Sequence, residues 1–428
     1  METPIYDFLK KYEQEPKLRL HMPGHKGKSP AEISFAYDIT EINGADSLFE
    51  ADGIIAQSEK NASALFKTKM TCYSAGGSTL CIQTMLALAK FEKRSIIAVR
   101  NVHRSFLSAC ALLDIQPQWI YPDYRAGFLS GEITAEAVEK ELKNTSNACV
   151  YITSPDYLGK TADIKAIAEV CHRYDAILLV DNAHGAHTAG TENHPIIQGA
   201  DMCCDSAHKM LPCLTGGAYL HINYEKYISR AKQTMSLFAS TSPSYLIMAS
   251  LDLCNDYIEN QLQSDTAEVV NALEKLRKKI SGQYKVYSSE PFHLTLLCNG
   301  IDLAEQLREK HVECEYADKY CIVLLFSPKN TAREIEILTM LLMLCEPKPA
   351  LSDTAIEFPH IERKMSIREA VMSESETINV NDADGRICAM VNVPCPPAVP
   401  IAVSGEVINK NLIKIFKNYG ISVVNVIK

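Results

Sequence analysis

Apolar and polar residues follow one another in blocks along the first half of the chain. Short apolar runs predict buried strands at 70–74, 95–99, 118–121, 148–153, 176–180 and 218–222. Segments with helical spacing predict helices at 79–92, 103–113, 132–143 and 162–174, with Thr134 as a helix cap. Strands that alternate with helices of this length indicate βαβ units and a mostly parallel sheet. The strands lack strict alternation, as expected when both faces of a sheet are covered. We therefore predict an α/β fold.

The texture of the sequence changes three times, which predicts four segments. Residues 1–50 read as an N-terminal arm and 51–255 as a large domain. A long polar-faced helix at 263–280 lies in a small α/β domain at 256–346, which ends with a helix from 331 to 345. A Pro-containing break precedes a C-terminal α/β module at 350–428.

Composition narrows the class of protein. The 428 residues carry 43 Lys and Arg against 52 Asp and Glu, a net charge of −9, which argues against nucleic-acid binding. No apolar run approaches the roughly 18 residues that span a bilayer, and the first residues lack the apolar core of a signal peptide. The 15 cysteines include no CxxC pair. We therefore expect a cytoplasmic protein in which Cys serves as a small buried apolar residue.

A glycine-containing turn follows the predicted strand at 70–74. Gly76, Gly77 and Ser78 stand where that strand passes into a helix. Free N–H groups and a partial positive charge at a helix N-terminus suit a phosphate. The turn matches neither the dinucleotide-binding nor the Walker pattern. It reads either as a phosphate site or as an ordinary turn capped by Ser78.

A carboxylate stands at the end of the predicted strand at 176–180. Ligand sites in open α/β sheets lie at the carboxyl ends of strands, so Asp181 could hold a cationic ring nitrogen. With His184 and His187 it could instead bind a metal. Both histidines also read as packed, hydrogen-bonded imidazoles.

A lysine follows another short apolar strand. Lys209 comes just before a Gly pair, at the expected carboxyl edge of the sheet. A desolvated Lys has a lowered pKa and forms Schiff bases, although Lys209 also reads as a surface lysine in a loop. Together, a phosphate turn, a strand-end Asp and a later Lys are the parts that bind pyridoxal 5'-phosphate.

The chain also resembles the ornithine/lysine/arginine decarboxylase family, whose fold is that of aspartate aminotransferase. The resemblance covers nearly the whole chain and begins too early for the N-terminal wing domain of longer members. It rests on His21–Gly27, Asn101–Ser105, Asp181–His187, Ser206–Lys209, Thr241–Tyr245, Met248–Asp252, Arg368–Ala370, Gly385–Ile387 and Pro394–Glu406.

This resemblance implies a role for each matched position around the cofactor. Lys209 would form the internal aldimine and Asp181 would pair with the pyridine nitrogen. His103 would stack on the ring and His184 would lie near its phenolic oxygen. The phosphate would be held by Gly76, Gly77, Ser78, Ser206 and His208. Ser240 and Thr241 would reach the phosphate of a neighbouring subunit, which implies a homodimer with shared active sites.

The sequence departs from the family pattern at several positions. Ala75–Ser78 replaces NGTS, so a hydroxyl is lost at Gly77, and Asn182 replaces an acid in DEAHGAH. The stretches 214–217 and 395–406 also differ. These changes leave the predicted aldimine residues in place, so they bear on the choice of substrate more than on the chemistry.

We therefore predict decarboxylation of arginine, lysine or ornithine to the amine, as in polyamine biosynthesis. Lys209 or His208 would return the proton to Cα, and Glu406, Asp46 or Asp52 would bind the distal cation of the substrate. Two alternatives stay open. One is another pyridoxal-phosphate reaction, an aminotransferase or lyase. The other is a metal-dependent hydrolase or binding protein built on Asp181, His184, His187 and His208.

Overall fold

The computed structural model describes most of the chain. The residues outside this description are 16–18, 20–21, 24–25, 27, 29–33, 125–129, 351–360 and 391–398. Much of the family-like segment His21–Gly27, and the start of the segment at 395–406, therefore lie outside the described residues. The chain forms two compact units, each built from two stretches: 1–92 with 178–266, and 93–177 with 267–428. The four segments expected from the sequence are continuous and stay a prediction.

A seven-stranded sheet carries the fold. Its order is β1 (Met70–Ser74), β9 (Ala218–Ile222), β8 (Met202–Asp205), β7 (Ile177–Asp181), β6 (Ala148–Thr153), β2 (Ser95–Val99) and β3 (Gln118–Ile120). The parallel pairs include β7 with β8, β2 with β6 and β2 with β3. Strand β9 runs antiparallel to both β1 and β8. The predicted α/β fold with a mostly parallel sheet is confirmed.

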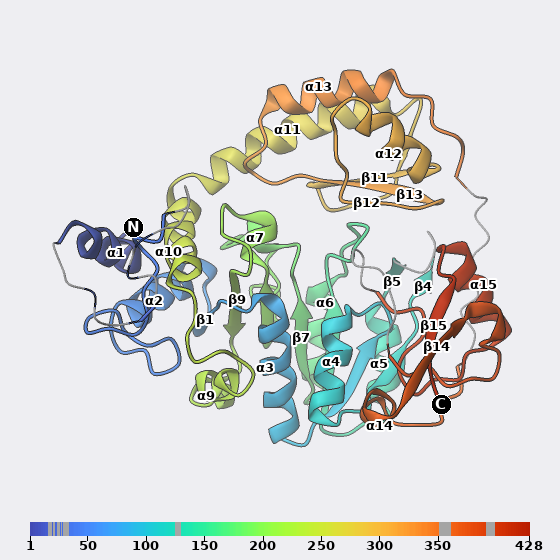
Figure 1. Ribbon diagram of the computed structural model, residues 1–428, viewed down its shortest axis with the longest axis horizontal. Coiled ribbons are helices and arrows are strands. Elements are labelled where there is room, and N and C mark those ends of the chain that lie inside the picture. The colour runs from blue at the N-terminus through green and yellow to red at the C-terminus, as the bar shows by residue number, and fades with distance from the viewer. Residues whose placement is uncertain are drawn as a thin grey trace. The chain divides into compact units, whose positions relative to one another are not determined.

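Helices of the first unit pack on its strands and on one another (Figure 1). Helix α3 (Gly77–Phe91) contacts β8 and β9 and is buried along most of its length. Helices α2 (Ile54–Phe66), α10 (Tyr245–Asn260) and α1 (Pro4–Gln14) contact one another. The expected arm thus begins with a helix whose first turn donates two backbone N–H groups to Asp252 of α10, at 3.0 and 3.1 Å. Shorter helices are α7 (Ala207–Met210), α8 (Glu225–Ile228), α9 (Ala231–Ser236) and the 3₁₀ turn η1 (Ala186–Thr188).

The second unit opens with the remaining strand–helix pairs. Helices α4 (Arg104–Leu113), α5 (Ala135–Leu142) and α6 (Ile164–Arg173) lie close to the predicted bounds. Thr134 caps α5 as expected, because its Oγ1 accepts a hydrogen bond from the N–H of Ala137 at 3.3 Å. A short ribbon of β4 (Asp123–Tyr124) and β5 (Gly131–Glu132) precedes α5.

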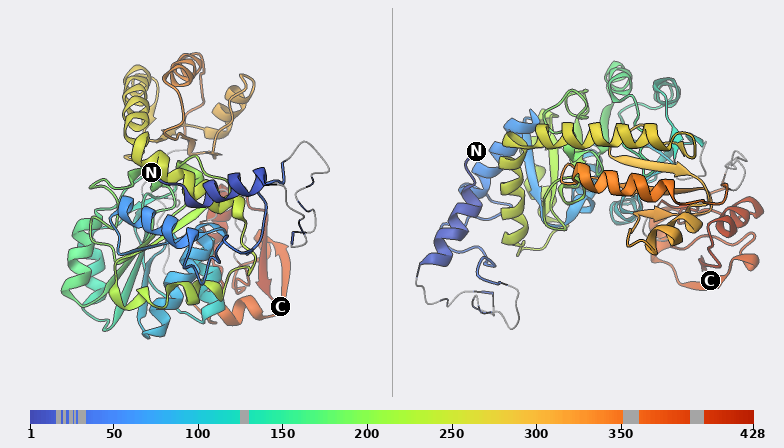
Figure 2. Two further views of the ribbon diagram at one scale, coloured as in Figure 1. Left: turned by 90° about the vertical axis from the view of Figure 1, so that its left-hand side faces the viewer. Right: turned by 90° about the horizontal axis from the view of Figure 1, so that it is seen from above.

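A second, four-stranded sheet follows in the same unit. Its antiparallel strands are β10 (Lys285–Val286), β11 (His293–Leu297), β13 (Cys321–Leu325) and β12 (Tyr316–Ala317). Helices α11 (Leu262–Ile280), α12 (Gly300–Arg308) and α13 (Ala332–Met343) cover one face of it (Figures 1 and 2). Thr331 begins α13 with a capping box to Glu334, which explains the helix start predicted there.

The C-terminal residues pair two strands that are distant in sequence, β14 (Ser375–Asn379) and β15 (Val423–Ile427). Helices α14 (Ile367–Met372) and α15 (Lys410–Asn418) and the turn η2 (Val380–Asp382) complete the segment. Its apolar side chains share a core with Leu158, Cys321 and Val323. Hydrophobic burial therefore ties the end of the chain to the second sheet.

Two composition-based expectations bear on the described residues. The cysteines in them are buried except for Cys213 and Cys314, as expected for a small apolar side chain. In the part of the chain that is described, no helix combines the length and apolar character needed to cross a bilayer.

Candidate active site

The predicted acid, Asp181, and the predicted lysine, Lys209, both lie in the first unit, near the carboxyl ends of the neighbouring strands β7 and β8. Asp181 is the last residue of β7 and is 2 % exposed. Its Oδ1 accepts hydrogen bonds from the N–H of Ala183, at 3.2 Å, and from Sγ of Cys204 on β8, at 3.7 Å. These contacts hold the carboxylate at the strand end.

Lys209 lies on the short helix α7, directly after β8, and it meets a residue from the turn after β7. Its Nζ is 3.0 Å from Nε2 of His184. The lysine side chain is exposed, whereas His184 is 6 % exposed. Of the two interpretations of Lys209, the structure favours an exposed lysine, although the residue lies on a short helix and not in a loop. A neighbouring imidazole, rather than burial, is placed to accept a proton from the amine.

The glycine turn after β1 has the open shape of an anion site. Gly77 adopts a left-handed φ of +66°, and a Cβ built there would meet no atom within 4 Å. Ser74 Oγ braces the turn, because it accepts from the N–H of Gly76 at 3.1 Å and donates to the carbonyl of Gly77 at 2.9 Å. The N–H of Gly77 donates to Gly216, at 2.8 Å. The next backbone N–H groups, from Ser78 onward, belong to the first turn of the 15-residue helix α3, where N–H groups have no partner within the helix.

Two residues on or beside α7 differ in how they are engaged. Ser206 is fully buried, and its Oγ has no hydrogen-bond partner among the described residues. His208 is half-buried, and its Nδ1 donates to the carbonyl of Gly217 at 3.0 Å. Burial lowers the pKa of His208 and so favours the neutral imidazole, and the bond to Gly217 places a proton on Nδ1.

Three more residues, Ser240, Thr241 and His103, were predicted to contact the cofactor. Ser240 and Thr241 are exposed, and Ser240 Oγ accepts from the N–H of Ser242 at 3.2 Å. His103 belongs to the second unit, where it caps α4 and its Nδ1 lies 2.7 Å from Oγ of Ser105. The cofactor roles of these three residues stay predictions.

Two of the three carboxylates considered for the distal cation are engaged by other groups of the protein. Asp46 accepts from five backbone N–H groups of 47–56, which lower its pKa although burial opposes them. Glu406 is 3 % exposed and pairs with Arg100 Nη2 at 3.0 Å. Asp52 is exposed. Asp46 therefore caps the start of α2, and Glu406 compensates a buried arginine.

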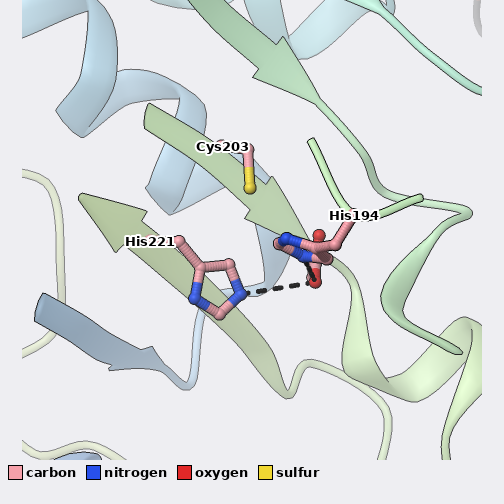
Figure 3. A group of neighbouring side chains, drawn as sticks. His194, Cys203 and His221 are labelled. Carbon is pink, nitrogen blue, oxygen red and sulfur yellow. Dashed lines mark hydrogen bonds and ion pairs between the residues drawn. The ribbon is translucent and has the colours of Figure 1, made fainter. Parts of the chain in front are cut away.

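Sequence reasoning missed a buried polar group beneath this site. Asp205, the last residue of β8, accepts from Nε2 of His194 at 3.0 Å and from Nε2 of His221 at 3.3 Å (Figure 3). Asn182 Nδ2 donates to its other oxygen at 2.7 Å. The available signal was an acid that ends the apolar strand 202–205, where an unpaired charge would be costly.

The metal donors that converge in the described part of the chain are not those proposed from the sequence. The atoms of His194, Cys203, Asp205 and His221 lie within 4.8 Å of one another. Cys203 faces His221 across β8 and β9, and Asp205 lies two residues along the same strand. The set of Asp181, His184, His187 and His208 does not converge in this way.

Comparisons with known proteins agree with one another. Residues 3–299 match the Orn/Lys/Arg decarboxylase major domain, and 353–420 match the C-terminal domain of that family. Arginine decarboxylase of Bacillus subtilis is 31 % identical over 97 % of this chain and 94 % of its own length. Arginine decarboxylase of Halalkalibacterium halodurans is 32 % identical over 96 % and 92 %. The structure of the Francisella novicida lysine decarboxylase superposes with a TM-score of 0.82 at 16 % identity, over 100 % of this chain and 81 % of the other.

Proposed function

Because this chain belongs to the Orn/Lys/Arg decarboxylase family, we propose that it converts arginine to agmatine and carbon dioxide, with pyridoxal 5'-phosphate as cofactor. Family membership makes it a decarboxylase of a basic amino acid. The choice of arginine rests on the two nearly full-length relatives that carry that name. The structural observation that supports this reaction is the contact between Lys209 Nζ and His184 Nε2. It lies at the carboxyl ends of β7 and β8, where β7 ends at the buried Asp181.

The residues present fit pyridoxal phosphate. The φ of Gly77 and the empty space beside it leave room for a phosphate at the start of α3. The buried Ser206 hydroxyl lacks a partner among the described residues and would gain one from a phosphate oxygen. Asp181 offers a buried carboxylate for a protonated ring nitrogen, and Lys209 offers the amine.

The bound cofactor supplies an electron-withdrawing ring that takes up the electron pair left when carbon dioxide departs. The chain's own residues prepare and complete the step. Asp181 would keep the ring nitrogen protonated, because an adjacent carboxylate favours the charged form. His184 Nε2 would accept the proton that Lys209 Nζ must lose before it can act as a nucleophile.

We further propose which of the two candidate residues, Lys209 or His208, returns the proton to the substrate Cα. His208 carries its one proton on Nδ1, where it is bonded to Gly217, and burial lowers its pKa. In the neutral imidazole that burial favours, Nε2 therefore carries no proton to deliver. We therefore propose that Lys209 Nζ delivers the proton, with His184 Nε2 3.0 Å away as its exchange partner.

A substrate panel tests this proposal. Purified protein with pyridoxal phosphate is given arginine, lysine or ornithine, and amine and carbon dioxide are measured against α-keto acid. We expect one amine per carbon dioxide and the highest kcat/KM with arginine. Keto acid in place of carbon dioxide would contradict the reaction, and a higher kcat/KM with lysine would contradict only the substrate.

The assembly is a further part of the proposal. We propose a cytoplasmic homodimer in which Ser240 and Thr241 contact the cofactor phosphate of the partner; their exposure leaves them available for such a contact. The cysteine content supports the reducing compartment. Co-expression of Lys209→Ala chains with Ser240→Ala/Thr241→Ala chains tests the sharing. Mixed dimers then hold one intact site, so random pairing restores about one quarter of wild-type activity. No recovery would contradict shared sites.

A further inference from the structure

We propose that Asp205 is a positioning residue: through Asn182, it sets the turn that holds His184 against Lys209. The inference deepens the proposed function and rests on it for the roles of His184 and Lys209. The carboxylate of Asp205 is hydrogen-bonded to Asn182, His194 and His221 and not to these two side chains. Its influence runs through one hydrogen bond between the ends of two neighbouring strands.

The surroundings of Asp205 determine where its carboxylate lies. It is fully buried between two imidazoles, His194 from the segment after η1 and His221 from β9, which donate to the same oxygen (Figure 3). Thr71 Oγ1 lies 2.9 Å from the remaining nitrogen of His221 and orients that ring. Burial alone would raise the pKa of Asp205, but the two imidazoles lower it. Asp205 is therefore an anion whose position is set by its donors.

The second oxygen of Asp205 carries this order to the turn after β7. It accepts from Asn182 Nδ2 at 2.7 Å, and Asn182 is 3 % exposed. The turn closes with a bond from the N–H of Gly185 to the carbonyl of Asn182, at 2.8 Å. A Cβ at Gly185 would lie 1.9 Å from Asn182 Oδ1, so the turn wraps tightly around this amide. His184 lies within the turn, and its ring direction depends on the amide.

The pairing also accounts for the amide at position 182. A carboxylate there would face Asp205 at hydrogen-bond distance, with both groups buried, and two such anions repel strongly. The acid that the family pattern has at this position is thus incompatible with the ionised Asp205. Asn182 and Asp205 form a matched donor and acceptor pair.

The side chains around Asp205 could also bind zinc. The hydrogen-bonded network and a zinc site differ in which side-chain atoms are protonated. In the proposed arrangement, Nε2 of both His194 and His221 carries a hydrogen that is donated to Asp205. A bound metal would require the ligating nitrogen of each imidazole to be deprotonated and Cys203 to be a thiolate. In the structure both imidazoles donate to Asp205, which is the hydrogen-bonded network.

An isosteric exchange tests the pair in the full-length protein. The variants are Asn182→Asp, Asp205→Asn, and both together. The first places two carboxylates face to face. The double variant restores one donor and one acceptor, with the direction of the bond reversed and an amide oxygen left for the two imidazoles. The measurements are the dissociation constant of pyridoxal phosphate, kcat and KM for arginine, and the urea midpoint.

We expect Asn182→Asp to weaken cofactor binding about tenfold or more and to lower kcat with little change in KM. The double variant should recover cofactor affinity to within about threefold of wild type. If Asn182→Asp fails to fold, recovery of folding and affinity in the double variant supports the same conclusion. A double variant that binds no better than Asn182→Asp overturns the proposal, as does an Asn182→Asp variant with wild-type affinity and kcat.

Two controls separate this inference from other causes. Asn255→Asp changes an equally buried amide, which donates to Tyr73 and Ser58 in the same unit. It should lower the urea midpoint and leave the cofactor dissociation constant of the folded protein unchanged. One equivalent of zinc that survives dialysis and is lost in Cys203→Ala would also overturn the proposal. A wild-type protein that binds no pyridoxal phosphate contradicts the proposed function instead, and the urea midpoints still test the bond.

Discussion

Replacement of Glu406 by Gln separates a structural carboxylate from a substrate-binding one. Arg100 is 1 % exposed, and its guanidinium donates to the carbonyls of Pro400 and Ile401 as well as to Glu406. Glu406 also accepts from the N–H of Val403 at 2.7 Å. The amide of Glu406→Gln keeps an acceptor but leaves the buried cation without an opposite charge. Removing one member of a buried ion pair costs about 3–5 kcal/mol, and the retained acceptor places this change near the lower end.

Urea unfolding followed by tryptophan fluorescence measures this cost close to the change. The chain has one tryptophan, and the ring of Trp119 lies 5.2 Å from Cζ of Arg100. As a control, Glu376→Gln breaks an exposed pair with Arg386 in the same unit, which contributes about 0–1 kcal/mol. We expect Glu406→Gln to lower the urea midpoint much more than Glu376→Gln, with KM for arginine unchanged. Unchanged stability together with a raised KM would refute the reasoning and assign Glu406 to the substrate cation.

Three further predictions follow from the first unit. Ser206→Ala removes a buried hydroxyl with no partner in the described residues, so it should weaken pyridoxal-phosphate binding in a titration while the urea midpoint without cofactor stays equal. Gly185→Ala forces a Cβ against Asn182, and we expect a stability loss of about 1–3 kcal/mol in urea unfolding; an unchanged midpoint would contradict the tight turn. The pKa of Asp205 is lowered by its imidazoles against the effect of burial. Its contribution to stability is therefore complete above the unfolded pKa of about 3.9 and is lost as pH falls through the lower folded value. The difference in urea midpoint between wild type and Asp205→Asn should be constant at neutral pH and shrink below about pH 4.

Local sequence pattern was sufficient for most strands of the seven-stranded sheet and for the positions of Asp181 and Lys209 at strand ends. Continuous apolar runs such as 95–99 and 148–153 are strands because both of their faces are covered. Asp181 and Lys209 were proposed because each follows such a run, and the carboxyl ends of parallel strands share one edge of a sheet; the structure places both residues after the neighbouring strands β7 and β8. Each of these signals is local, because the residue lies within a few positions of the apolar run that it follows.

Helix α1 was missed for a different reason. Its Lys and Glu residues led us to predict only an N-terminal arm, although Ile5, Leu9 and Tyr12 stand at helical spacing and are buried on one face. The helix forms because that face packs on α2 and α10. The partner helices come from distant parts of the chain, so the local pattern alone carried little weight.

The contacts around Asp205 and Glu406 depend on the tertiary structure. Asn182 meets Asp205 because β7 and β8 are neighbours, and His221 joins them through the register of β9. Arg100 meets Glu406 across 306 residues of sequence. No spacing rule within the sequence specifies which strands lie side by side, so these partners could not be predicted from motifs.

The central claim is that Lys209 operates a pyridoxal-phosphate-dependent decarboxylation. The most direct measurement is the release of carbon dioxide and agmatine from arginine by wild type, Lys209→Ala and Lys226→Ala, each with pyridoxal phosphate. Lys226 is an exposed lysine with one weak ion pair, 3.8 Å from Glu92, and serves as the control. We predict equal amounts of the two products from wild type and Lys226→Ala, and a loss of at least about a thousandfold in Lys209→Ala. Undiminished release from Lys209→Ala, or no release from wild type with any basic amino acid, would contradict the account.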